Sequence, residues 1–281
     1  MEAPKRRGFT LVELLVALVL LFVVGSGMYS LLLAVQRVSR KQAEVSGLQG
    51  GLRTGLQLVQ SELQEVAANN GAASSDILSM TATSISYRGM RGLGETCSVS
   101  TTTVKVRQSS WSGLRAPANP RESLALYMDN DSTLASDDSW RLLDGPSISA
   151  STCPDGAAAW SFGVSLTAAD VAKTYVPGPV RTYEQMEIGR ITDGGADWLG
   201  LRSISAGESA LVPVVGPITS NGVGFKYYDL TGAETGTPSA VATIVITLRG
   251  MTQHAVNSGV SGALGNATDS LRVRVQLRNS L

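Results

Sequence analysis

The sequence contains little of the chemistry from which catalytic and metal sites are built. It has one histidine, His254, two cysteines and only 5% aromatic residues. At most one imidazole is therefore available for a metal centre or a nucleophile–base pair. The chain also has no G-x-S-x-G motif, no P-loop and no G-x-G-x-x-G motif after a strand. These absences predict a protein that is not an enzyme, with no catalytic residue, no cofactor and no metal.

Net charge is absent as well, because 23 Lys and Arg residues balance 23 Asp and Glu residues. A neutral chain has no general attraction to nucleic acid or to acidic partners. One segment does carry a basic face, formed by Arg272, Arg274 and Arg278 with Arg249, which could contact phosphate. No row of aromatic residues accompanies these arginines, so nucleic acid is not the favoured partner.

The acidic residues cluster once, at Asp129, Asp131, Asp137 and Asp138. The segment DNDST begins like a calcium-binding loop, with oxygen ligands at alternate positions. It lacks the glycine at the sixth position and the glutamate at the twelfth that such loops use. A polar turn between two strands is the favoured interpretation, and calcium at Asp129 and Asp131 is the alternative.

What the sequence does have is a long apolar segment near its N-terminus. The 23 residues from Leu14 to Gln36 carry no charge. A helix needs about 20 residues to cross the hydrocarbon core, whereas the apolar part of a secretory signal peptide has only about 7–15. No A-x-A-like cleavage site closes the segment, so it predicts a retained anchor. Basic residues precede and follow it almost equally, and charge alone does not orient it.

Glu13 stands at the start of this apolar segment. An ionised carboxylate inside an apolar helix costs about 3 kcal/mol on insertion scales, which makes it a candidate functional residue. The alternative is that Glu13 only marks the membrane interface, since it lies one turn inside the segment. The residue by itself does not separate these interpretations.

The segment KRRGFTLVELLVALVLL resembles the N-terminal signal of type IV prepilins and pseudopilins. It joins a short basic leader, Gly8, Phe9 and a glutamate four residues beyond Phe9 to a long apolar helix. The resemblance implies that a prepilin peptidase cuts between Gly8 and Phe9 and methylates the new amine of Phe9. It further implies that Glu13 attracts the Phe9 amine of a neighbouring subunit, and that the leader is cytoplasmic while the rest lies outside.

The helical pattern continues beyond the span and becomes amphipathic. Apolar residues follow one another at spacings of three, four or seven, and polar residues including Glu62 occupy the other side. A coiled-coil dimer would also show this spacing. We favour packing on a sheet of the same chain, because Gly47, Gly50, Gly51 and Gly55 would weaken a free coiled coil. Gly25 and Gly27 predict either a bend in the span or close helix packing. The apolar stripe consists of Val38, Val45, Leu48, Leu52, Leu56, Val59, Leu63 and Val66.

From about Ile77 the period of the pattern changes from 3.6 to 2, which predicts an antiparallel sheet and an α+β fold. Turn segments separate the strands: DNDS, DGPS, CPDG, DGGAD and LTGAETGTP. The predicted strands are Ser98–Gln108, Ser123–Met128, Met186–Ile191, Trp198–Ile204, Val223–Asp229, Ala240–Gly250 and Ser270–Asn279.

The end of the chain adds a second resemblance. The segments VGFKYYDLTG, AVATIVITLRG and QLRN are similar to PilW-type minor pilins, and more distantly to the J-type minor pseudopilins of type II secretion. In an exported chain, Cys97 and Cys153 would be a candidate disulfide; two unpaired cysteines are the alternative. Many major pilins have a disulfide-bonded loop near the C-terminus. Because Cys97 and Cys153 both lie in the middle of the body, we do not assign the role of that loop to this chain.

Together these observations predict a leader at 1–8, a helix at 9–67 that spans the membrane at about 14–36 and is amphipathic at about 37–67, and a β-rich body at 68–281. The expected function is that of a minor type IV pilin, with a minor pseudopilin as the alternative and a pilin-mounted adhesin or DNA receptor as a third. Expected partners are the prepilin peptidase, other pilins, the inner-membrane assembly platform and lipid. The expected location is the inner membrane in a single pass, and then the pilus.

Overall fold

The computed structural model describes residues 10–68, 75–113, 115–130, 133–134, 138–257 and 264–277. Contacts within the chain divide it into two units. One contains the chain up to Gly47 together with Thr252–Ala267, and the other contains Leu48–Met251 with the C-terminal segment from Thr268.

One long helix, α1 (Leu11–Gln64), follows the predicted pattern. It is continuous through Gly25 and Gly27, so the span is not unwound there. It ends three residues before the predicted position, because Ala67 has left the helical ladder. The backbone N–H of Ala67 donates to the Asp76 carboxylate at 3.0 Å, and Asp76 N–H donates to the Ala67 carbonyl at 2.9 Å.

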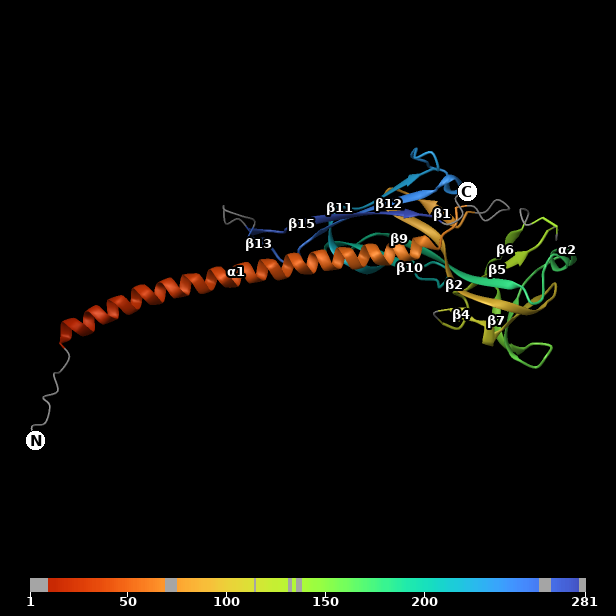
Figure 1. Cartoon of the computed structure of the whole chain (residues 1–281), viewed down its shortest axis with the longest axis horizontal. Helices are drawn as coiled ribbons and strands as arrows, with labels where there is room; N and C mark the ends of the chain where they lie inside the picture. Colours follow the sequence, from red (N-terminus) through yellow and green to blue (C-terminus); the bar gives the residue numbers. More distant parts are fainter. Residues whose placement is uncertain are drawn as a thin grey trace, which may run out of the picture. The chain divides into compact units, whose positions relative to one another are not determined.

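The apolar stripe is confirmed in the C-terminal part of the helix. Leu52, Leu56, Val59 and Leu63 are buried. The stripe does not extend back to Val38, which is 55% exposed. Helix packing on a sheet of the same chain, predicted from the glycines, is therefore confirmed for the turns from Leu52 onward (Figure 1).

In the part of the chain that the structure describes, thirteen strands form one sheet whose strand pairs are all antiparallel, as predicted for an α+β protein (Figure 1). The main order is β15-β12-β11-β10-β9-β2-β3-β8-β7. The first seven strands are β1 (Ile77–Met80), β2 (Ser84–Val99), β3 (Thr103–Arg107), β4 (Ser112–Gly113), β5 (Ser123–Met128), β6 (Ser139–Leu143) and β7 (Ser147–Thr152). The next six are β8 (Ala158–Gly163), β9 (Pro179–Asp193), β10 (Ala196–Ser203), β11 (Val212–Tyr228), β12 (Thr243–Met251) and β15 (Thr268–Gln276). Short helices η1 (Gln108–Ser110), α2 (Ala168–Ala172) and η2 (Pro238–Ala240) lie between them.

The larger core lies between α1 and the strands β2, β9, β10, β11, β12 and β15. Its buried members include Leu52 and Leu63 of the helix with Tyr87, Phe225 and Ile246 of the sheet. Leu271, Val273 and Val275 of β15 face this core, while Arg272 and Arg274 are exposed, as the alternating pattern predicts. Burial of such large side chains contributes roughly 1.5–3 kcal/mol each and holds the helix on the sheet.

Two glycines allow the helix to approach the sheet closely. A Cβ at Gly55 of α1 would lie 2.5 Å from Cγ2 of Val215, and a Cβ at Gly250 of β12 would lie 2.5 Å from Leu48 and 2.9 Å from Leu52. At Gly55 a larger residue would meet the stiff Val215 side chain, whereas at Gly250 the ends of the two leucine side chains would have to shift.

Gly55→Ala is therefore expected to destabilise the body by about 1–3 kcal/mol, since Val215 is β-branched and cannot rotate away freely. Gly51→Ala is the matched control, because a Cβ there meets nothing within 4 Å. Alanine should stabilise that exposed helical position by about 1 kcal/mol or slightly less. Urea unfolding of the full chain in detergent, followed by tryptophan fluorescence, measures both. If Gly55→Ala stabilised the protein and Gly51→Ala destabilised it, or if both stabilised it, the close approach at Gly55 would be contradicted.

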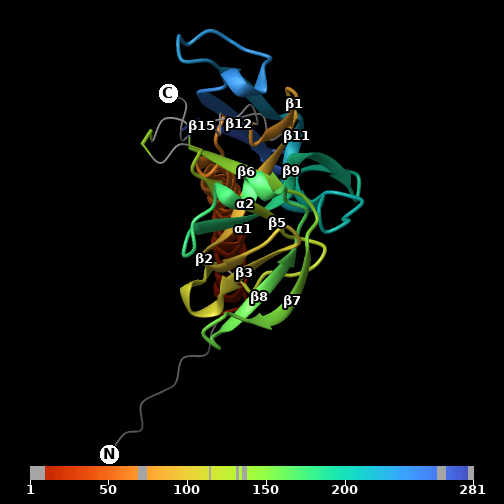
Figure 2. The ribbon, with the colours of Figure 1, turned by 90° about the vertical axis from the view of Figure 1, so that its right-hand side faces the viewer.

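A second core, separate from the larger one, lies where β3, β5, β7 and β8 meet (Figure 2). Val104, Val106, Leu124 and Phe162 are among its buried members. The predicted strand Ser98–Gln108 is wrong as a single strand, because the chain turns between β2 and β3. There Ser100 N–H donates to the Thr103 carbonyl at 2.8 Å and the Ser100 hydroxyl lies 2.9 Å from that of Thr103.

The predicted turns coincide with glycines of left-handed backbone conformation. Gly145, Gly156, Gly194, Gly195 and Gly232 have φ between 58° and 85°. They fall in DGPS, CPDG, DGGAD and LTGAETGTP, where only glycine adopts such φ values without cost. The fifth segment, DNDS, begins the connection of the β5–β6 hairpin, whose register runs from Leu124↔Leu143 to Met128↔Ser139.

The other unit contains the N-terminal part of α1 and a two-stranded hairpin, β13 (Val256–Asn257) with β14 (Leu264–Gly265). The His254 ring Nδ1 lies 2.8 Å from Oε1 of Glu44 on the helix. This hydrogen bond lowers the pKa of the Glu44 carboxyl. His254 is exposed, and its partner is Glu44.

Candidate assembly site

The N-terminal part of α1 presents its apolar side chains on the surface. From Thr10 to Leu32 every residue is exposed, and Leu11 is 79% exposed. This part of the chain includes Phe22, Met28 and Tyr29, which are each at least 65% exposed. α1 is the one described helix long and apolar enough to cross a membrane by length and composition. An apolar surface of this size requires lipid or other apolar helices to cover it.

The helix begins with a reciprocal cap between Thr10 and Glu13. The Glu13 backbone N–H donates to the Thr10 hydroxyl at 3.3 Å, and Thr10 N–H donates to Glu13 Oε2 at 3.1 Å. The Thr10 hydroxyl also lies 3.1 Å from Glu13 Oε2. This is a capping box, which supplies partners to backbone N–H groups that the first helical turn leaves unpaired. The T-x-x-E spacing could have revealed it, but the sequence interpretation considered Glu13 only for its charge.

The cap leaves part of the Glu13 carboxylate available. Both bonds from Thr10 end on Oε2, so within the described residues Oε1 can accept from a second donor. An amine that reached it in an apolar environment would be attracted more strongly than in water. Gly8 and Phe9, the predicted processing residues, lie outside the described residues.

The other end of α1 is attached to the body by a buried network of charges that the sequence interpretation missed. Glu62, predicted to face solvent, is half-buried and accepts from Arg91 of β2 at 3.0 Å. Arg91 also bonds Glu184 of β9 at 3.0 Å. Arg115 links Glu184 to Glu122, at 2.5 and 2.7 Å respectively. Helix, sheet and the loop before β5 are thus joined through alternating charges.

Burial shifts the titration of this network. Burial raises the pKa of the Glu122 carboxyl, while the charge of the Arg115 guanidinium acts in the other direction. Burial alone would lower the pKa of the Arg91 guanidinium, but its pKa is raised because Glu62 and Glu184 favour the charged form. Tyr87 donates to Glu62 at 2.9 Å, and burial followed by the Glu62 charge raises the pKa of its phenol. Arg121, 3.8 Å from Glu184, brings the network to three carboxylates and three guanidiniums, and removing any member leaves a neighbour with fewer partners.

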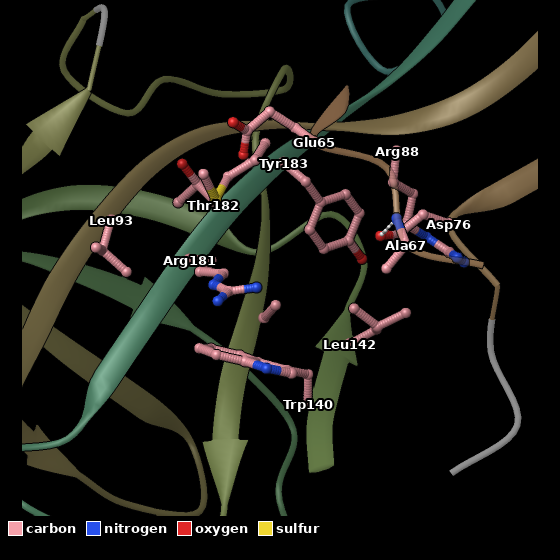
Figure 3. Close-up of a pocket in the computed structure, with 12 residues that line it drawn as sticks. Glu65, Ala67, Asp76, Arg88, Leu93, Trp140, Leu142, Arg181, Thr182 and Tyr183 are labelled. Carbon is pink, nitrogen blue, oxygen red and sulfur yellow. Dashed lines mark hydrogen bonds between the residues drawn. The ribbon is translucent and has the colours of Figure 1, made fainter. Parts of the chain in front are cut away.

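One cleft of about 440 Å³ lies on the body, beside the chain that follows α1 (Figure 3). The guanidinium of Arg181 lies over the Trp140 ring at 4.1 Å, and that of Arg88 lies 5.7 Å from the centre of the Tyr183 ring. Arg88 donates to the Ser75 carbonyl at 2.7 Å and Tyr183 donates to Asp144 at 2.8 Å. These bonds hold the arginines and aromatic rings against each other within the sheet.

The remaining predicted site residues lie in the body. Cys97 and Cys153 form a disulfide with their Cα atoms 5.6 Å apart, beside the second core. Asp129 accepts from the Tyr175 hydroxyl and Asp138 from the Tyr127 hydroxyl. Asp131 and Asp137 lie outside the described residues, and the described part of the chain contains no group of three potential metal ligands.

Comparison with known proteins identifies the N-terminal segment. Residues 3–29 match the family described as the prokaryotic N-terminal methylation motif. No curated protein and no solved structure matches the chain. The motif indicates a pilin or pseudopilin that is processed by prepilin peptidase and assembles with other pilins. Together with the exposed apolar helix, it fits a membrane-anchored, pilus-associated protein.

Proposed function

We propose that this chain is a minor type IV pilin of the PilW type, a structural subunit that helps to initiate or cap a pilus and catalyses no reaction. The observation that carries the proposal is the exposed apolar part of α1, which begins at the Thr10–Glu13 cap. Its side chains suit lipid before assembly and other pilin helices afterwards. The C-terminal turns of the same helix are packed into the body, so the body follows wherever the helix is assembled.

Within this proposal the processing site is the Gly8–Phe9 bond, and Glu13 guides assembly by attracting the methylated amine of a neighbouring subunit. The unshared Oε1 of Glu13 supports this second role. The minor rather than major position rests on the VGFKYYDLTG, AVATIVITLRG and QLRN segments, whose described residues include the end of β11, most of β12 and Gln276 at the end of β15. A minor pseudopilin of type II secretion is the alternative. Loss of surface pili on deletion supports the first, and loss of secreted enzymes with normal pili supports the second.

Four single variants separate processing, capping and charge. Gly8→Ser should leave the leader uncut, because a peptidase that recognises glycine before the bond would not accept the added side chain. Glu13→Gln keeps an acceptor for the Thr10 N–H but removes the charge. Thr10→Ala removes the hydroxyl half of the cap and keeps the charge, at a cost of about 1 kcal/mol in helix stability. Glu13→Ala removes both.

We expect Glu13→Gln and Glu13→Ala to be processed normally but to be depleted from sheared pili by about tenfold or more, the factor that corresponds to ~1.4 kcal/mol. Thr10→Ala should be incorporated nearly as well as the unmodified chain. Gel mobility and the N-terminal mass report processing, and immunoblots of the sheared fraction report incorporation. Normal incorporation of both Glu13 variants and of Gly8→Ser would refute the proposal. Loss of Thr10→Ala with retention of Glu13→Gln would assign Glu13 to the cap instead.

A further inference from the structure

The strand β15 is one open edge of the sheet. It pairs with β12 over nine positions, from Thr243↔Gln276 to Met251↔Thr268, and no other described strand adjoins it. Leu277 N–H donates to the Ala242 carbonyl at 3.0 Å. With the register of the pair, this bond means that the odd-numbered residues of β15 direct their backbone N–H and C=O groups toward β12. In an antiparallel ladder the residues between them direct their N–H and C=O groups away from it. The outward-directed residues of β15 are Thr268, Ser270, Arg272, Arg274 and Gln276.

Three arginines without an ion pair line the outer face at this edge. Arg272 and Arg274 are exposed and lie opposite Thr247 and Val245 of β12, and Arg249 is exposed on β12 itself. None of the three is within salt-bridge distance of a described carboxylate. By contrast, six other arginines of the body lie within salt-bridge distance of a carboxylate: Arg91, Arg107, Arg115, Arg121, Arg190 and Arg202.

The inner face of the same edge is apolar and incompletely covered. Leu271 and Val273 pack against the larger core but are only partly buried, whereas Val275 is fully buried. Leu48 of α1, which packs against the same core, is also partly buried. A further strand beside β15 would cover these side chains and supply partners for the outward N–H and C=O groups.

We propose that the edge of β15 binds an extended segment of a partner protein in which acidic and apolar residues alternate. Added to the sheet, the segment would place its carboxylates beside Arg272 and Arg274 and its apolar side chains beside Leu271 and Val273. A second copy of β15 does not fit, because two such edges would bring like charges together across the pair. This inference stands independently of the pilin proposal.

The test uses the full chain in detergent and a fluorescein-labelled nine-residue peptide of alternating Val and Glu. Fluorescence anisotropy at low salt should show saturable binding. A peptide of alternating Val and Lys, and one with the same Val and Glu residues in blocks, should bind at least about tenfold more weakly. Binding of all three peptides with equal affinity, or of none, would overturn the proposal.

Two variants and one further measurement make the test specific. Arg272→Glu should weaken binding about tenfold or more, and Arg274→Glu should act in the same way. Arg53→Glu, which alters an exposed arginine of α1, should leave it unchanged. Hydrogen exchange should show new protection at the amides of Arg272 and Arg274 when the peptide is bound. Binding without that protection, or equal weakening by Arg53→Glu, would show that the peptide attaches by charge alone and that no strand is added.

Discussion

Replacing Arg91 with alanine is expected to lower the free energy of unfolding of the body by about 3–5 kcal/mol, because Glu62 loses its guanidinium partner and Glu184 keeps only Arg115 and the more distant Arg121. The side chain of Arg91 is 10% exposed, and those of Glu62 and Glu184 are 18% and 4% exposed. Water therefore cannot replace the guanidinium. Because Glu62 is on α1 and Glu184 is on β9, the change should also loosen the attachment of the helix.

Urea unfolding of the full chain in detergent, followed by tryptophan fluorescence, measures this loss. Arg107→Ala is the matched control, since its ion pair with Asp155 is largely exposed and should contribute less than about 1 kcal/mol. Equal effects of the two variants would show that the network contributes no more than an ordinary surface pair. Glu62→Gln in the Arg91→Ala background should cost much less than Glu62→Gln alone, since the two residues act through one contact.

The second large effect is expected from the disulfide. Replacing Cys97 and Cys153 together with serine removes a link between residues 56 positions apart. On the chain-entropy model such a loop stabilises the folded state by about 4 kcal/mol. The loss should fall mainly on the second core, because the disulfide joins β2 to the connection before β8.

Melting temperature with and without a reducing agent provides both the measurement and its control. The unmodified chain should melt at a lower temperature in reductant, and the double serine variant should melt at that lower temperature under both conditions. Trp111 and Trp160 lie in contact near this region, so their fluorescence should change before global unfolding. An unchanged melting temperature in the double variant would show that the loop is already ordered without the bond.

Much of the secondary structure could be predicted from the sequence because its causes are local. The uncharged segment from Leu14 to Gln36, the three-and-four spacing up to Leu63, and the alternation of β15 each repeat within a few residues. Glycine in a turn is equally local, since Gly156 or Gly232 occupies a backbone conformation that other residues avoid. These features needed no knowledge of distant contacts.

The predictions that failed depended on distant contacts or on competing local bonds. The run of β-branched residues after Ser98 has the same β propensity on both sides of a turn, and only the Ser100–Thr103 bonds end the strand. Glu62 has the same sequence spacing as the solvent-facing residues of α1. Its partner Arg91 is 29 positions away, so its burial could not be read from the helical pattern.

The sequence by itself determined that this chain has an apolar N-terminal helix with Glu13 at its start, an N-terminal methylation motif and a β-rich body, because short periods and short motifs carry that information. Only the tertiary structure decided that Glu62 ties the helix to Arg91 and Glu184, and that β15 is left as an open edge. Ion pairs between distant residues and the order of strands depend on which residues meet in space. The whole fold decides which residues meet, and neighbours in the chain do not.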